Sequence, residues 1–489
     1  MNPVKITRIP TLKTVQQFRE YVASLGIDLQ VEDTIVGGPE SPLNQPLQWN
    51  GRTIGNRWAI HPMEGWDGTR TGGITEPMRR RWQRFGESGA KLIWGGEAMA
   101  IRPEGRANAN QIIINEENKA GIASLRETLV KAHKESFGNT DDLVIGYQLT
   151  HSGRFCRPND HHHIESLVAY RHPLLDKKFN VTSDAQILSD DYMKALVGDY
   201  VKAAKIAYET GADFVDIKHC HGYLLHEFLG AHTRPGEYGG SFENRTRMLR
   251  DIVAAIRSEV PNIGLGVRLS AFDSVPFKPD PDPTLSQPGK LGPGIPEDFS
   301  ECLPYRYGFG MKPENPLEMD LTETAKFLAL CEQLGVQLVN LSAGSPYYNP
   351  HIGRPNAYPP SDGYQPPEEP LIGCARQINA MKQLKAQFPN LILVGTAYSY
   401  LQEYLPQVAQ YYLRNGHVDS VGIGRAVLSY PRMLADAAGK GALELRNICR
   451  TFSDCTTAPR NGMASGCYPL DNYYKSTPEA ALLKQIKKA

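Results

Sequence analysis

A group of titratable side chains follows a short apolar run in the stretch VDIKHCHGYLLHEFLG, residues 215–230. Its members are Lys218, His219, Cys220, His221 and Tyr223. Such groups cost free energy to bury unless they are paired or hydrogen-bonded, so we expect them where a strand opens onto solvent, a partner or a ligand. Such a cluster marks a candidate functional site, where these groups could contact a bound ligand.

Other interpretations apply to parts of this stretch. His219 and Cys220 are expected to be structural. We predict no zinc site on the H-C-H run, because neighbouring residues of an extended chain point to different faces. Lys218 at a strand end could instead form a Schiff base with a carbonyl substrate, as the lysines of barrel aldolases do. Both chemistries of Lys218 stay open at this level.

Repeated βα units must position these side chains. From about Arg57 onward, short β-branched or apolar runs alternate with longer amphipathic ones, which predicts strands and helices around a parallel sheet. Eight strands are predicted, at residues 57–63, 91–99, 143–149, 214–218, 263–269, 338–344, 391–396 and 418–425. A helix is predicted after each, at residues 75–88, 116–136, 190–209, 241–258, 320–334, 372–386, 399–414 and 431–438. Eight units predict a single (β/α)8 TIM barrel with long βα-loop insertions, because a minimal barrel needs only about 250 residues. A doubly wound sheet is the alternative.

Long Pro- and Gly-rich insertions follow three of the strands, at residues 152–188, 271–318 and 343–370. All three leave the carboxyl ends of predicted strands, the face where barrel enzymes keep their active sites. The last insertion mixes tyrosine with proline and could form a pocket wall, or equally a surface elaboration or subunit contact. We predict three parts of the chain: an N-terminal extension (1–45), the barrel (46–438) and a short C-terminal extension (439–489).

The overall composition excludes some classes of binding partner and indicates where in the cell the protein is expected. The chain has 489 residues, of which 41% are hydrophobic and 22% charged, as in globular proteins. Lys plus Arg equals Asp plus Glu at 53 each, so there is no basic field to drive binding to nucleic acid or to an anionic membrane. The sequence has no apolar run of about 18 residues and no signal peptide, so we expect a cytoplasmic protein with reduced cysteines. These features are compatible with a homo-oligomer.

Further polar residues end other predicted strands on the same face. Arg268 lies on an apolar strand, where its guanidinium would face a ligand or form a buried ion pair with a carboxylate such as Asp216. Gln148 is an amide on another apolar strand and needs both donors and acceptors as partners. A phosphate site is predicted after the last two strands, because glycine lets backbone amides approach an anion closely. Its residues are Gly395, Gly422, Gly424 and Arg425.

Eight short motifs, in this order and spacing, resemble the Old Yellow Enzyme family of flavin-dependent ene-reductases. They are Pro62-Met63, Gly96-Glu97-Ala98, QLTHSGR, HGYLLHEFL, RPGEYGGSFENRTR, GVRLS, GTA and VGIGRA, and they cover roughly residues 45–438. Any one motif is modest, whereas eight in register are specific. The resemblance implies a barrel that carries flavin mononucleotide (FMN) at the carboxyl ends of its strands, is reduced by NADH or NADPH, and passes a hydride to an activated alkene.

The resemblance also implies roles for single residues, carried over position by position. Pro62, Met63 and Ala98 would contact the flavin ring, and Gln148 would hydrogen-bond its pyrimidine edge. Arg268 would face the edge of the ring where negative charge collects in the reduced flavin. The ribityl phosphate would be held by Gly395, Gly422, Gly424 and Arg425.

The catalytic pattern of this family, H-x-x-[HN]-G-Y, falls on Lys218, His221 and Tyr223. The first and fourth positions would hold a carbonyl oxygen or an anion above the flavin, and the tyrosine would deliver a proton. Lys218 departs from the pattern, because an ammonium is a full charge without an acceptor role, which suits a carboxylate or enolate on the substrate. Glu64 is a second departure: relatives often have a small or sulfur-bearing residue there, and a carboxylate would disfavour the reduced flavin anion.

The C-terminal extension contains Cys449, Cys455 and Cys467. Larger relatives that act on dienoyl-CoA have an iron–sulfur tail of the form C-x2-C-x3-C-x11-C, and only Cys455-x11-Cys467 matches it. The missing ligands fall on Ile448 and Thr451, so we expect no metal site and interpret the tail as a remnant of a 4Fe-4S site.

We therefore predict an FMN-dependent oxidoreductase that transfers a hydride from NADH or NADPH, through the flavin, to an activated unsaturated small molecule, which could be anionic. The chain is most similar to the 2,4-dienoyl-CoA reductase branch of the family, reduced to its barrel domain. Two other classes stay open: a flavin-free lyase or aldolase that uses Lys218, and a barrel that has lost catalysis and serves as a binding partner.

Overall fold

Residues 4–286 and 290–487 are described by the computed structural model of the chain. Residues 1–3, 287–289 and 488–489 lie outside this part, so the predicted terminal extensions and the 271–318 insertion are described only in part. The division into extensions and barrel stays a prediction.

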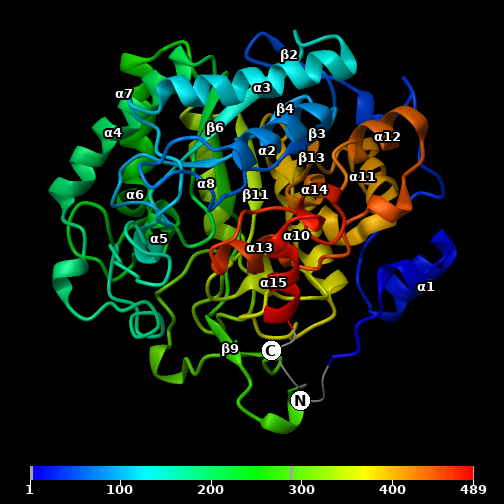
Figure 1. Cartoon of the computed structure of the whole chain (residues 1–489). Coiled ribbons are helices and arrows are strands. Elements are labelled where there is room, and N and C mark those ends of the chain that lie inside the picture. Colours follow the sequence, from blue (N-terminus) through cyan, green and yellow to red (C-terminus); the bar gives the residue numbers. More distant parts are fainter. Residues whose placement is uncertain (1–3, 287–289, 488–489) are drawn as a thin grey trace.

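Eight parallel strands form a closed barrel at the centre of the molecule (Figure 1). In order around the barrel they are β3 (Trp58–Ile60), β4 (Leu92–Ile93), β6 (Val144–Thr150), β7 (Phe214–Ile217), β8 (Gly264–Ser270), β11 (Leu338–Ser342), β12 (Ile392–Gly395) and β13 (Ser420–Ile423). Pairing of β4 with β6, where Leu92 lies opposite Val144, closes the ring. A short strand, β5 (Ala98–Ala100), continues beside β6. The predicted (β/α)8 barrel is confirmed, and each strand overlaps its predicted range.

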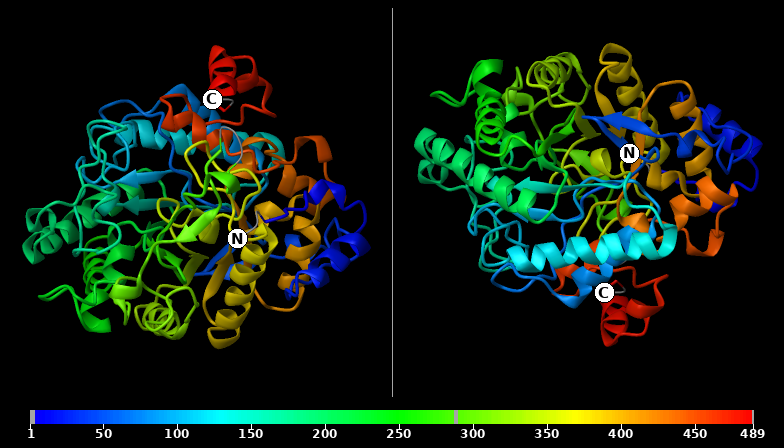
Figure 2. Two further views of the ribbon diagram at one scale, coloured as in Figure 1. Left: turned by 90° about the horizontal axis from the view of Figure 1, so that it is seen from below. Right: turned by 90° about the horizontal axis from the view of Figure 1, so that it is seen from above.

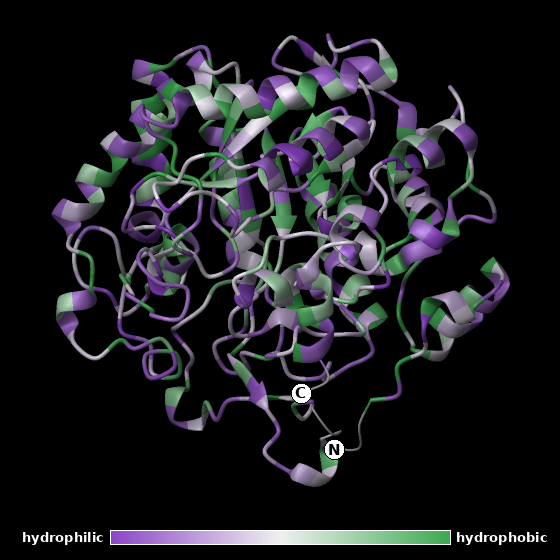
Figure 3. Ribbon diagram, in the orientation of Figure 1, coloured by the Kyte–Doolittle hydropathy of each residue, from purple (hydrophilic) through white to green (hydrophobic). Residues whose placement is uncertain are grey.

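Helices form the outer layer around the strands (Figures 1 and 2). They are α2 (Glu76–Glu87), α3 (Lys119–Phe137), α4 (Asp190–Glu209), α7 (Arg247–Glu259), α8 (Thr322–Gln333), α10 (Pro370–Gln387), α11 (Leu405–Arg414) and α12 (Met433–Lys440). Each turns an apolar stripe inward: α7, for example, buries Leu249, Ile252, Val253 and Ile256, at the spacing of one helix face. Figure 3 shows apolar residues along the barrel strands and many polar residues on the surrounding helices. Across residues 4–286 and 290–487, no helix combines the length and the apolar character that a bilayer crossing would demand.

An apolar plug fills the amino end of the barrel. A hairpin of β1 (Leu47–Trp49) and β2 (Arg52–Ile54) covers this end. Trp49 and Trp94 both pack edge to face on Phe214, with ring centroids 5.8 and 5.2 Å apart. Apolar side chains fill this end of the barrel. The polar residues lie further along the strands, at the opposite, carboxyl end.

Both termini pack against the outside of the barrel. Near the N-terminus, α1 (Val15–Ser24) is held by Phe18, which stacks on Tyr404 at 4.3 Å. The C-terminal helices α13 (Asp454–Arg460), α14 (Asn472–Lys475) and α15 (Pro478–Ile486) project from one side of the molecule (Figure 2). Arg80 and Arg84 of α2 form ion pairs with Asp471 at 2.9 and 2.8 Å, and these pairs fix the tail to the barrel.

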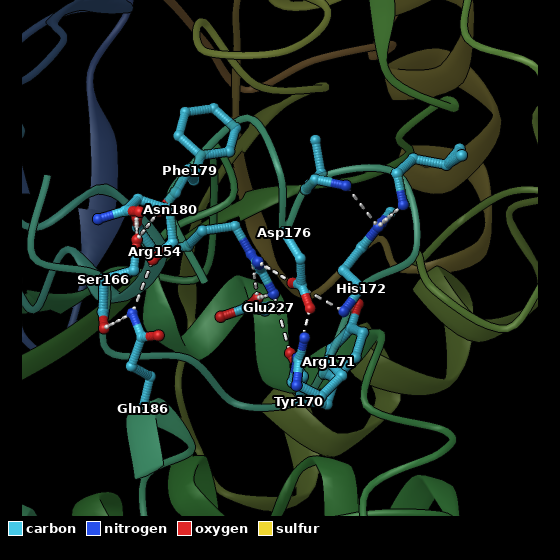
Figure 4. A network of polar contacts seen from close by, with 12 residues as sticks. Arg154, Ser166, Tyr170, Arg171, His172, Asp176, Phe179, Asn180, Gln186 and Glu227 are labelled. Carbon is cyan, nitrogen blue, oxygen red and sulfur yellow. Dashed lines mark hydrogen bonds and ion pairs between the residues drawn. The ribbon is translucent and has the colours of Figure 1, made fainter. Parts of the chain in front are cut away.

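A buried network centred on Arg154 anchors the 152–188 insertion (Figure 4). The Arg154 guanidinium forms ion pairs with Asp176 at 2.6 Å and with Glu227 at 2.7 Å, and it donates to the carbonyl oxygen of Tyr170 at 2.9 Å. Glu227 lies in α5 (Leu224–Leu229), just after β7, so the network ties the loop after β6 to the turn after β7. The two carboxylates raise the pKa of Arg154 against the effect of its burial.

We expect Arg154→Met to lower the free energy of unfolding by about 3–5 kcal/mol, because it leaves Glu227 buried without its ion-pair partner. Arg171→Met is the matched control: Arg171 also pairs with Asp176, but its side chain is 43% exposed. The control should lower the free energy of unfolding by at most about 1 kcal/mol. Urea denaturation of both variants measures the difference, and equal losses would contradict the role of the network.

Candidate active site

Lys218 follows β7 directly, and its side chain lies at the carboxyl end of the barrel. The residue is 4% exposed, and its ammonium nitrogen lies 3.4 Å from the centroid of the Tyr223 ring. Among the described residues, no carboxylate lies within ion-pair distance of this ammonium. Burial lowers the pKa of Lys218 below its ordinary value. Since an unpaired buried cation is costly, the position favours a negatively charged or strongly dipolar ligand.

His221 lies beside Lys218 in a left-handed backbone conformation, with φ +66°. Its backbone N–H donates to Ser270 Oγ at 2.9 Å, and its Nε2 lies 2.9 Å from Ser342 Oγ. Burial, followed by the nearby charges of Arg268 and Lys218, holds the pKa of His221 well below its ordinary value. His221 is therefore a neutral imidazole, fixed between the ends of β8 and β11.

Tyr223 completes the predicted catalytic group and brings in two residues from other loops. Its hydroxyl donates to the carboxylate of Glu64 and lies 2.8 Å from the hydroxyl of Tyr347. Burial, and then the charge of Glu64, raises the pKa of Tyr223 well above its ordinary value. The three residues predicted from the catalytic pattern thus lie together, with Glu64 and Tyr347 added to them.

Arg268 extends from β8 and is 7% exposed. Its guanidinium Nε has no hydrogen-bond partner among the described residues. The alternative of an ion pair with Asp216 does not form: one oxygen of that carboxylate accepts the backbone N–H of Arg268 at 2.6 Å. The other accepts the indole N–H of Trp94 at 2.8 Å and the amide of Gln148 at 2.6 Å. Arg268 is therefore a second buried cation that needs an acceptor.

The residues predicted to contact a flavin ring lie together at the ends of β3 and β4. The N–H of Met63 donates to the carbonyl of Gly96 at 3.2 Å, and the N–H of Ala98 donates to the carbonyl of Met63 at 3.0 Å. Pro62 precedes Met63 on the same segment. Gln148 lies opposite Ala98 in the sheet. One N–H of its amide is bonded to Asp216, so its second N–H and its carbonyl oxygen remain for a ligand.

The predicted phosphate residues divide into two groups. Gly395 and Gly422 have a packing reason to be glycine: a Cβ would lie 3.1 Å from Tyr398 at the first position and 2.1 Å from the ring of His61 at the second. At Gly424, a Cβ would approach only the Cβ of His61, at 3.8 Å. Among the described residues, no acceptor is bonded to the backbone amides of Gly424 or Arg425, so these amides are available to an anion.

A second arginine lies near this end of the site. Arg425 donates to the hydroxyl of Thr456, and Arg354 donates to Ser453 Oγ at 2.9 Å. Burial and then the neighbouring charge of Arg425 lower the pKa of Arg354 to about 10. Two cations held by hydroxyls of the C-terminal extension therefore approach each other, as a doubly charged phosphate would require.

The cysteines of the C-terminal extension are free thiols. Burial raises the pKa of Cys449 and raises that of Cys467 to about 12. Within the described ranges, no group of three or more His, Cys, Asp or Glu is arranged to hold a metal ion. The interpretation of the tail as an iron–sulfur remnant stays a prediction.

Comparison with known proteins shows which family this chain resembles. The sequence profile of the NADH:flavin oxidoreductase / NADH oxidase family matches residues 42–281. The match covers just under half of the chain, and it shows that this part of the chain is similar to that family. The predicted resemblance to Old Yellow Enzyme is confirmed by this match, by the relatives and by the fold.

Two relatives illustrate the similarity of this chain to curated proteins. The NADH:flavin oxidoreductase FG08077 of Gibberella zeae is 25% identical over 366 residues, which cover 72% of this chain and 74% of that protein. An NADPH dehydrogenase of Bacillus pumilus is 32% identical over 241 residues, which cover 48% of this chain and 65% of that enzyme. The second alignment thus spans less than two thirds of the Bacillus enzyme.

Two solved structures share the barrel fold of this chain. The complex of 2-naphthoyl-CoA reductase with 2-naphthoyl-CoA gives a TM-score of 0.63 at 16% identity, covering 88% of this chain and 57% of that one. An Old Yellow Enzyme homologue from Zymomonas mobilis gives a TM-score of 0.53 at 21% identity, covering 81% of this chain and 91% of that one. At these identities the similarity extends to the fold alone.

Sequence reasoning missed two residues of this candidate site. Tyr347 and Arg354 both lie in the 343–370 insertion, which was recognised only as a candidate pocket wall. The signal available was a tyrosine-rich loop with an arginine, leaving the carboxyl end of a barrel strand. Nothing in the sequence indicated that Tyr347 contacts Tyr223, 124 positions away.

We expect Gly422→Ala to lower the free energy of unfolding by about 1–3 kcal/mol, because the new methyl group would overlap the buried ring of His61. Gly424→Ala is the matched control, since its methyl group would meet only ordinary van der Waals contact, at 3.8 Å. Chemical denaturation without added ligand measures both. Similar losses in the two variants would contradict this division of the glycines.

Proposed function

We propose that this chain is an FMN-dependent oxidoreductase that moves a hydride from NADH or NADPH, through the flavin, to an activated unsaturated small molecule. One observation carries the proposal: Lys218 and Arg268, at the ends of the adjacent strands β7 and β8, are buried cations without a carboxylate partner among the described residues. Breaking a buried ion pair costs about 3–5 kcal/mol. Two unpaired cations at the carboxyl end of the barrel, which we call its mouth, therefore require two anionic or dipolar ligands there. A reduced flavin and a substrate oxygen meet this requirement.

The residues present fit FMN. When bound, FMN supplies the hydride chemistry of the reaction. Pro62, Met63 and Ala98 would contact its ring, and the free carbonyl oxygen of Gln148 would accept from its pyrimidine edge. Arg268, with its unpartnered Nε, would stabilise negative charge on the reduced ring.

The phosphate would be held by the open amides of Gly424 and Arg425 and by the guanidinium groups of Arg425 and Arg354. Gly395 and Gly422 would contribute through close packing of the turns that present these amides. This end of the site resembles the phosphate sites that other barrels build after their last two strands.

On the substrate side, Lys218 and His221 would bind an oxygen of the substrate, and Tyr223 would protonate the adjacent carbon. The ammonium of Lys218 favours an acceptor that is anionic or becomes so, such as a carboxylate, or a carbonyl that passes through an enolate. The substrate class that follows is an unsaturated acid or an enone of modest size.

A second candidate is a flavin-free lyase or aldolase. The lowered pKa of Lys218 supports it, because a neutral amine is the nucleophile that forms a Schiff base. The two candidates differ in an immediate property of the purified protein. The oxidoreductase is yellow with bound flavin, whereas the lyase is colourless and is trapped by borohydride together with a carbonyl ligand.

We expect Arg268→Ala to weaken FMN binding, or to lower the reduction potential of the bound flavin. Loss of one charged hydrogen bond of about 1.5–3 kcal/mol corresponds to roughly a 10- to 100-fold weaker interaction. Arg268→Lys retains the charge, so its flavin content and reduction potential should lie between those of Arg268→Ala and the wild type. Flavin content and a redox titration measure the effect, and unchanged values in Arg268→Ala would refute the assignment.

We expect Lys218→Ala to slow reoxidation of the reduced flavin by an unsaturated acid or enone by about 10²–10³-fold, the loss typical of one polarising donor. Reduction of the flavin by NADH or NADPH should stay largely intact, because Lys218 would contact the substrate only. Stopped-flow measurement of the two half-reactions separates these effects. Equal losses in both would show that Lys218 is not the substrate anchor.

A further inference from the structure

The hydroxyl of Tyr223 lies in the middle of a chain of three oxygen atoms. It donates its only hydrogen to Glu64 Oε2, and the hydroxyl of Tyr347 lies 2.8 Å away on its other side. Because the hydrogen of Tyr223 is directed to the carboxylate, Tyr347 is the donor in the second bond. The hydrogens of the chain therefore run from Tyr347 through Tyr223 to Glu64.

The carboxylate end of this chain is fixed by the backbone on both sides of Glu64. The preceding residue, Met63, donates its N–H to the carbonyl of Gly96 at 3.2 Å. The following residue, Gly65, donates its N–H to Glu97 at 3.0 Å, and Glu97 is itself held by the buried Arg81. Glu64 thus occupies a constrained position directly after the predicted flavin contacts.

The other end of the chain is held by packing. The ring of Tyr347 stacks on Phe155, with centroids 4.1 Å apart and an interplanar angle of 17°. The backbone N–H of Tyr347 donates to Ser345 Oγ at 3.2 Å, and that hydroxyl donates to the carbonyl of His221 at 2.8 Å. Tyr347 is only half-buried and follows the exposed Pro346, so this end of the chain approaches solvent.

Lys218 balances the charge of the chain. Its ammonium lies on the face of the Tyr223 ring, 3.4 Å from the centroid. An ammonium there stabilises negative charge that develops on the phenol oxygen during proton transfer. The carboxylate of Glu64 on one side and the ammonium of Lys218 on the other leave the phenol between opposite charges.

We propose that Glu64 is the residue that exchanges the proton of Tyr223, so that Glu64, Tyr223 and Tyr347 form a proton relay to the substrate; this inference rests on the proposed function. In the reductive direction, the Tyr223 O–H bond breaks as the new C–H bond forms on the substrate. Glu64, which must first take a proton from water to become a carboxylic acid, then passes that proton to the Tyr223 oxygen and restores the Tyr223 O–H bond. Glu64 is left as a carboxylate and regains a proton from water. In the opposite direction, Tyr223 takes a proton from the substrate carbon and passes its own to the Glu64 carboxylate.

Glu64 acts through Tyr223, so it is a positioning and relay residue. A carboxylate that merely tunes the flavin would affect the reduction of the flavin and its reoxidation together. A relay residue affects only the step in which the substrate gains or loses a proton. The two roles therefore predict different results for the two half-reactions.

The test uses the holoenzyme with Glu64→Gln, which retains the shape of the side chain but cannot exchange the proton. Cyclohex-2-enone and cinnamate are the oxidising probes, and NADH and NADPH are the reductants. We expect reoxidation of the reduced flavin by the probe to slow about 100-fold, as for loss of a general acid–base group. The solvent deuterium isotope effect on this step should rise, whereas the rate of reduction by the nicotinamide should change far less.

Three further variants complete the design. Glu64→Asp keeps the carboxylate and should recover part of the rate. Tyr347→Phe keeps the stacking on Phe155 and should cause a smaller loss than Glu64→Gln. Glu104→Gln is the matched control, because Glu104 accepts its hydrogen bond from Tyr192, at 3.1 Å, and not from Tyr223, so it should change neither half-reaction.

Wild-type rates in Glu64→Gln, or equal losses in both half-reactions, would overturn the relay while leaving the proposed function in place. A wild-type protein that retains no FMN, or whose reduced flavin neither probe reoxidises, would overturn the proposed function and the relay with it. Flavin content and turnover of the wild type thus test the proposed function. The half-reaction rates of Glu64→Gln relative to the wild type test the relay.

Discussion

The buried carboxylate of Asp216 is the constraint on which the mouth of the barrel depends. It is fully buried, and it accepts hydrogen bonds from Trp94, Gln148 and the backbone of Arg268, so it joins four neighbouring segments of the barrel. Burial raises its pKa to about 6 despite these donors. Because neutral donors occupy both of its oxygens, Asp216 positions Arg268 without forming an ion pair with its guanidinium. The cation is left available to a ligand, and the orientation of Gln148 is fixed by the same contact.

Asp216 lies between an apolar layer and a polar layer of the barrel interior. Below Asp216, the aromatic plug of Trp49, Trp94 and Phe214 fills the amino end of the barrel. Above it, the strand ends carry cations, an imidazole and phenols, which the long loops cover. A site at this depth excludes water from one side, and interactions with developing charge are stronger there than in bulk solvent. The apolar plug therefore closes one end of the barrel and leaves the polar strand ends at the other.

The departures from the family pattern are consistent with one another. Lys218 replaces a neutral imidazole by a full positive charge, and Glu64 introduces a full negative charge on the other side of the same phenol. Either change alone would alter the net charge of the mouth, whereas both together leave it unchanged and polarise Tyr223 between them. At the opposite end of the site, the C-terminal extension supplies Ser453 and Thr456, which hold Arg354 and Arg425. The tail thus has a structural role that does not depend on its cysteines.

The sequence by itself determined the eight βα units, because the spacing of apolar residues that distinguishes a strand from a helix lies within one short segment of the chain. It also determined which strand ends carry titratable residues, so Lys218, His221, Tyr223, Gln148 and Arg268 could be predicted to converge once a closed parallel barrel was inferred. Only the tertiary structure decided how these groups are partnered. Asp216 could have been an ion-pair partner of Arg268 or a hydrogen-bond acceptor for its backbone, and the sequence permits both. Likewise Glu64, Tyr223 and Tyr347 come from three loops separated by 159 and 124 positions. Contacts between such distant loops depend on the closure of the barrel and on side-chain packing, which leave no periodic trace in the sequence.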